Sequence, residues 1–85
     1  MQIFIETGMG EDFWLEVEQG DSLIMLKEEI YRMTRIAPDN QMLGYKDQVL
    51  TQENMTMSDY NIQEGSIIHL YWDSSSDGSS GSSMF

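Results

Sequence analysis

The sequence of 85 residues contains no cysteine, and this absence limits the chemistry that the chain can carry out. Disulfide bridges, zinc sites built on thiolates and cysteine nucleophiles are all excluded. A small fold that forms without disulfides is typical of a reducing compartment. We therefore expect the protein in the cytoplasm, the nucleus or both.

Basic residues are scarce, with four lysines and arginines against fifteen acidic residues and a formal net charge of −11. Such a charge repels nucleic acid and anionic lipid alike, so neither is expected as a partner. A charged partner would be basic. The simpler interpretation is that the acidity keeps a small protein soluble, and we expect a monomer.

Long hydrophobic runs are also missing, and no basic segment followed by an apolar stretch opens the chain. We therefore expect no membrane-spanning helix and no targeting segment. Hydrophobic residues make up 40% of the sequence, which suits one small domain with a single core. No internal repeat divides the chain further.

Alternating apolar residues predict a β-hairpin at the start of the chain. Over residues 1–7 the apolar residues Ile3 and Ile5 share one face of a strand, and Phe13, Leu15 and Val17 share one face of a second strand. The sequence Gly8-Met9-Gly10 lies in the loop between them. This spacing places Ile3 opposite Leu15 and Ile5 opposite Phe13 on the core side.

A helix is predicted over residues 22–34, where the apolar spacing changes from two to about 3.6 residues. The hydroxyl of Ser22 can accept a hydrogen bond from a free backbone N–H of the first turn. Pro38 prevents any continuation of the helix. The residues expected on the buried face are Leu23, Leu26, Lys27 and Ile30.

The second half of the sequence predicts two short strands, a polar excursion and a last strand. The short strands are expected at residues 41–45, with Leu43 and Tyr45 inward, and near residues 49–50. The excursion covers residues 51–59, with Met57 turned inward, and the last strand alternates over residues 67–71. One helix across a mixed sheet of four to five strands is an α+β fold.

Several short motifs, in the same order along the chain, resemble the ubiquitin family. They are "MQIF" at the start, "LEVE" at residues 15–18, "PD" at 38–39, "SDYNIQ" at 58–63 and "HL" at 69–70. The resemblance covers almost all of residues 1–71. It implies a β-grasp fold with the sheet order second strand, first, last, third, fourth, in a ubiquitin-like domain over residues 1–72.

The resemblance also shows what this chain lacks. Attachment of ubiquitin requires a tail that ends in Gly-Gly, whereas residues 73–77 here read Asp-Ser-Ser-Ser-Asp, and Gly78 and Gly81 are separated by serines. Of the lysines on which ubiquitin chains are built, Lys27 alone is retained. The resemblance places Lys27 against the body of the fold, where we expect a partly buried ion pair with an acid such as Glu53. It also places Arg35 at the helix end, where a left-handed residue, normally glycine, is wanted.

The segment of residues 73–85 has the composition of a flexible serine-rich and glycine-rich linker. It is expected to be a tether to a further domain, a natural disordered end of the chain, or a remnant of expression. Ser74, three residues before Asp77, is a candidate phosphorylation site that would make the segment more acidic.

Ubiquitin receptors bind an apolar patch, and the resemblance places that patch at Gly8, Gly44 and Tyr71, with His69 retained. Two of the three anchoring side chains are therefore missing. Loss of each would remove ~1.5–3 kcal/mol of transfer free energy from an interface. Ordinary ubiquitin receptors are expected to bind this degenerate patch poorly.

Strand alternation predicts a different apolar surface on the outer face of the sheet. Its expected members are Phe4, Trp14, Ile67, His69, Tyr71 and Met42. Exposed aromatic residues and methionine with an acidic rim are typical of a protein-binding site. The alternative is that Phe4 and Trp14 form a cross-strand pair that only stabilises the sheet.

Catalysis has little support in the sequence. His69 is the only histidine, and an acid or a serine is expected beside it on the outward face only by chance. The acidic residues do not follow a metal-ligand spacing. No cofactor and no metal are predicted. The sequence thus favours a non-catalytic, non-conjugated ubiquitin-like interaction domain for a protein partner, which could belong to the ubiquitin pathway. The alternatives are a ubiquitin-like modifier and a decoy or regulator of ubiquitin conjugation.

Overall fold

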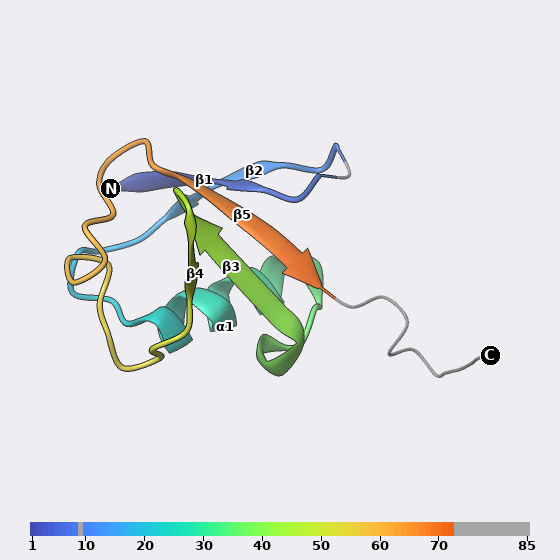
Figure 1. Cartoon of the computed structure of the whole chain (residues 1–85). Helices are drawn as coiled ribbons and strands as arrows, with labels where there is room; N and C mark the ends of the chain where they lie inside the picture. Colours follow the sequence, from blue (N-terminus) through green and yellow to red (C-terminus); the bar gives the residue numbers. More distant parts are fainter. Residues whose placement is uncertain (9, 73–85) are drawn as a thin grey trace.

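The computed structural model describes residues 1–8 and 10–72. In this part of the chain, one α-helix crosses one face of a five-stranded sheet (Figure 1). The strands are β1 (Gln2–Glu6), β2 (Phe13–Glu16), β3 (Gln41–Tyr45), β4 (Gln48–Leu50) and β5 (Ile67–Trp72). The helices are α1 (Leu23–Thr34) and the short 3-10 helix η1 (Pro38–Asn40).

The sheet has the order β2-β1-β5-β3-β4, which places the last strand in the centre. β5 is parallel to β1 and antiparallel to β3, and the two outer pairs are antiparallel. This mixed sheet with one helix is the α+β β-grasp arrangement that the sequence predicted. The predicted strand order is also confirmed.

The core lies between α1 and the inner face of the sheet. Ile3 and Ile5 of β1 are fully buried, as are Leu23 and Ile30 of α1. Because side chains alternate along a strand, burial of the inward set leaves the other set on the face that α1 does not cover. Met57, from the excursion between β4 and β5, is also fully buried, as the sequence predicted.

The element bounds differ from the predicted ones in several elements, and β5 extends to Trp72 instead of ending at residue 71. β1 is shorter than residues 1–7, and β2 ends at Glu16, although Val17 is buried and its N–H donates to the Met1 carbonyl at 2.8 Å. The 3-10 helix Pro38–Asn40 was not predicted. Proline at its first position supplies a suitable φ and needs no N–H partner there, so Pro38 begins a helical turn as well as ending α1.

Arg35 ends α1 in the left-handed conformation that the resemblance implied, with φ of 67°. Its N–H donates to the Tyr31 carbonyl at 2.7 Å, and its guanidinium lies 5.9 Å from the Tyr31 ring centre.

Since a side chain is strained in this conformation, Arg35→Gly is expected to raise the free energy of unfolding by about 0.5–1 kcal/mol in urea denaturation. The control Arg32→Gly, inside α1, should lower it by about 1 kcal/mol. A less stable Arg35→Gly variant would contradict this.

The amino group of Met1 is held at the sheet edge beside β2. It donates to Glu16 Oε2 and to the Val17 carbonyl, both at 2.8 Å. The hydrogen bond to the Glu16 carboxylate raises the pKa of this amino group above its ordinary value. A raised pKa in the folded state stabilises the fold most while the amino group is charged in both states, and this contribution is lost as pH rises through the folded-state pKa.

We therefore expect the stability difference between the chain and its Glu16→Gln variant to depend on pH. The difference should be largest below about pH 8, the ordinary pKa of an amino terminus, and should shrink at higher pH. Thermal unfolding of both proteins from neutral to alkaline pH measures it. A difference that stays constant or grows with pH would be incompatible with this ammonium–carboxylate pair.

Candidate functional site

The first part of the candidate site lies on β1, β2 and β5, on the face opposite α1. Phe4 is paired with Trp14 across β1 and β2 and with Ile67 across β1 and β5, as the sequence predicted. The Phe4 and Trp14 ring centres lie 5.1 Å apart at a tilt of 58°. Trp14 is 55% exposed and Ile67 48% exposed, so both remain open to solvent beside Phe4.

The second part lies on β5 and β3. Tyr71 is paired with Met42, and each side chain is more than half exposed. His69, two residues before Tyr71, stacks on its ring with centres 6.4 Å apart. A shallow pocket of about 270 Å³ adjoins this pair and reaches Asp39. The register thus places all six predicted residues on one face, which we call the outer face.

Val49 belongs to the outer face and was not predicted. It is 54% exposed and is paired with Gly44, which is itself paired with His69. The sequence did hold the necessary information, because the two-residue turn Lys46-Asp47 fixes the register of β3 and β4. Once Gly44 was placed outward, its partner across this hairpin also had to face outward.

The two glycines of the degenerate receptor patch leave space on this surface. Gly44 lies in β3 between His69 and Val49, and a side chain added there would meet Tyr71 Cε2 at 3.8 Å. The Tyr71 ring therefore lies next to the position that an anchoring side chain would take. Gly8 follows β1 with φ of 76°, a conformation that disfavours any larger residue.

His69 has an acidic neighbour, which the sequence analysis did not expect. Glu6 Oε1 lies 2.7 Å from His69 Nδ1, because the parallel register of β1 and β5 pairs these two residues. Both side chains are about 40% exposed. A carboxylate can orient an imidazole, but nucleophilic catalysis also needs a nucleophile within hydrogen-bond reach of that ring. In residues 1–8 and 10–72, His69 forms no hydrogen bond to a hydroxyl group, so the pair with Glu6 fixes the ring on the surface.

The Lys27 side chain forms an ion pair within the fold. It is largely buried, and its Nζ lies 3.5 Å from Glu53 Oε2. The ion pair predicted from the resemblance is thus confirmed. A lysine held in this way is poorly placed for attachment of another protein through its amine.

Two other features, metal sites and membrane-spanning helices, were sought in residues 1–8 and 10–72. These residues contain no cluster of three or more histidine or acidic side chains that could hold a metal ion. Among them, no helix has the length and apolar character needed to cross a membrane. Ser74 and the segment 73–85, where the sequence predicted a phosphorylation site and a tail, lie outside the described residues.

Comparisons with known proteins agree with the β-grasp arrangement of the sheet and the helix. The ubiquitin family model matches residues 3–74. A curated relative from Arabidopsis thaliana, described as NEDD8-like protein RUB3, is 30% identical over 70 residues, which is 82% of this chain and 88% of the relative. The match extends over the hairpin, the helix and the three remaining strands, and the chain is therefore a member of the ubiquitin family.

Proposed function

We propose that this chain is a non-catalytic ubiquitin-like interaction domain that binds a protein partner through the outer face of its sheet and is not conjugated to targets. One observation carries this proposal. Five large apolar side chains are about half exposed on the same face, at Trp14, Ile67, Tyr71, Met42 and Val49. The solvent-facing side of a sheet is normally polar, so a surface of this kind is typical of a binding site.

The composition of the outer face also favours binding. Aromatic residues and methionine are enriched at the centres of protein interfaces, where a few side chains supply most of the affinity. Two acids at the rim are engaged within the chain: Glu16 with the Met1 amino group and Glu64 with the Gln2 N–H at 3.0 Å. Together with the net charge of −11, this rim favours a partner that surrounds an apolar centre with basic residues.

The competing interpretation is that Phe4 and Trp14 only stabilise the hairpin. A cross-strand aromatic pair contributes about 0.2–1 kcal/mol, so Trp14→Ser should cost no more than that in stability. Affinity capture followed by quantitative mass spectrometry would compare Trp14→Ser with the control Met25→Ser, because Met25 is 48% exposed on α1, away from the sheet. We expect Met25→Ser to retain the captured partner and Trp14→Ser to lose it. Equal capture by both would leave only the stabilising role.

A second function is favoured by the relative from Arabidopsis thaliana, whose description as NEDD8-like suggests a ubiquitin-like modifier. Residues 73–77 of this chain argue against it, because they carry aspartates and serines where conjugation requires arginines and paired glycines. A decoy that occupies a conjugation enzyme without being consumed needs no such residues. Competition in a ubiquitin-transfer assay would identify a decoy.

The modifier alternative has a direct test. Incubation of the chain with ubiquitin-activating enzyme and ATP is expected to give no thioester adduct, because an unhindered diglycine terminus is missing. Replacing residues 73–77 with the tail of ubiquitin, ended at its diglycine, tests whether the folded domain itself is accepted. A thioester formed by the unaltered chain would reject the non-conjugated role.

A further inference from the structure

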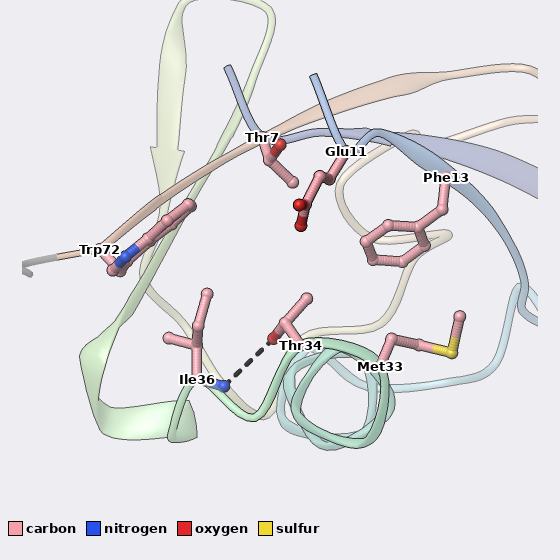
Figure 2. Close-up of a pocket in the computed structure, with 7 residues that line it drawn as sticks. All are labelled: Thr7, Glu11, Phe13, Met33, Thr34, Ile36 and Trp72. Atoms are coloured by element: carbon pink, nitrogen blue, oxygen red, sulfur yellow. Dashed lines mark hydrogen bonds between the residues drawn. The ribbon is translucent and has the colours of Figure 1, made fainter. Parts of the chain in front are cut away.

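A second recess lies on the helix side of the sheet, away from the outer face. It has a volume of about 330 Å³ and opens where β5 ends, where β2 begins and where α1 ends. This volume falls within the range of small-molecule and side-chain pockets. The residues that line it are Thr7, Glu11, Phe13, Met33, Thr34, Ile36 and Trp72 (Figure 2).

The walls of this recess are apolar and aromatic, and its polar groups are mostly satisfied within the chain. The Thr34 hydroxyl donates to the Ile30 carbonyl at 2.8 Å. It also accepts from the Ile36 N–H at 3.2 Å, as Figure 2 shows. Thr7 interacts with Asp12, whose Oδ1 accepts from the Thr7 N–H at 2.8 Å. The recess therefore offers few unused donors to an anionic or neutral polar ligand.

Glu11 is the exception. Figure 2 shows its carboxylate pointing into the space between the Trp72 and Phe13 rings. Among the described residues it forms no ion pair and no hydrogen bond through its side chain. No basic residue lines the recess. A carboxylate beside aromatic rings is a favourable setting for a cation with an apolar stem.

The chain's own cations are all committed elsewhere. Lys27 is paired with Glu53, and Arg32 lies 3.2 Å from Glu29. The two others lie over aromatic rings, with Arg35 5.9 Å from the Tyr31 ring centre and Lys46 5.4 Å from the Tyr45 ring centre. None of these four side chains lines the recess, so we expect a cation that neutralises Glu11 to come from another molecule.

We propose that this recess binds an arginine side chain of a partner protein, with the guanidinium at the Glu11 carboxylate and the methylene stem against Trp72 and Ile36. Arginine fits better than lysine, because its planar guanidinium can stack on an aromatic ring while it donates to a carboxylate. Trp72 also lines the shallow pocket beside Tyr71 and Met42, whereas Glu11 and Phe13 line this recess and not that pocket. Binding here stands or falls independently of the proposed function.

The test uses the full chain of 85 residues and a defined probe, the acetylated and amidated pentapeptide Gly-Gly-Arg-Gly-Gly. Titration followed by two-dimensional amide NMR of isotope-labelled protein is expected to shift Glu11, Phe13, Ile36 and the Trp72 indole. In a control peptide, citrulline replaces the arginine; citrulline is neutral and has nearly the same shape. This peptide should bind about fivefold more weakly than the arginine peptide. Saturable shifts confined to the outer face, or no saturable shifts, would overturn the proposal.

Two sets of variants separate specific binding from general attraction and from occupation by the chain itself. Glu11→Gln should weaken arginine binding about fivefold, whereas Glu28→Gln, an exposed position on α1 with the same change in charge, should leave it unchanged. An equal loss in both would assign the effect to net charge and overturn the proposal. The double variant Met84→Ser, Phe85→Ser removes the two large apolar residues of segment 73–85 and is measured without peptide. If it shifts the amide signals around the recess, these residues of the chain itself occupy the recess, and the proposal is also overturned.

Discussion

Leu70→Ala is expected to lower the free energy of unfolding by about 3–4 kcal/mol, the largest loss of stability among the changes considered. Leu70 is 1% exposed and lies in β5, the central strand, where it is paired with Leu43 of β3. Removal of its side chain loses the transfer free energy and leaves a cavity between the sheet and α1. Urea denaturation measures the loss.

The control is the next residue in the same strand. Tyr71 points the opposite way and is 57% exposed, so Tyr71→Ala should cost at most about 1 kcal/mol in the same measurement. Comparable losses for the two variants would mean that the inner and outer faces of β5 have been assigned wrongly. A small loss for Leu70→Ala would have the same meaning.

The second large effect concerns binding. Trp14→Ser is expected to weaken the interaction with the captured partner at least about thirtyfold, equivalent to about 2 kcal/mol, because truncation of a central aromatic residue has this effect at interfaces. Tyr71→Ser, at the other part of the outer face, should give a loss of similar size. Isothermal titration calorimetry with the purified partner measures both changes.

Met25→Ser serves again as the matched control, because it removes an exposed apolar side chain from α1. Its affinity should equal that of the unaltered chain. If Trp14→Ser and Met25→Ser bind alike while Trp14→Ser alone loses stability, Phe4 and Trp14 are a structural pair. The outer face would then have no part in binding at that end.

Much of the fold could be predicted from the sequence because local patterns and the family resemblance agree. The alternation of Ile3 and Ile5 with Phe4 fixed which residues face the core, and a shift of one residue would have moved Phe4 inward. The pairing of Phe4 with Trp14 followed from the same register. The helix began and ended where capping by Ser22 and the spacing of apolar residues indicated.

The features that were missed depend on contacts between strands far apart in the sequence. Glu6 and His69 are 63 positions apart, and only the exact register of β1 and β5 places them together. Val49 joined the outer face through its pairing with Gly44. The recess at Glu11 depends on the relative positions of the end of α1, the start of β2 and the end of β5. No local sequence pattern encodes these positions.

Photo-cross-linking tests the role of the outer face most directly. In separate variants, p-benzoylphenylalanine replaces Trp14, Tyr71 or Met25, and irradiation links the chain to any protein in contact with that position. We expect the same partner to be linked at Trp14 and at Tyr71, and not at Met25 on α1. Linkage of that partner at Met25, or at neither position of the outer face, would contradict binding through the sheet.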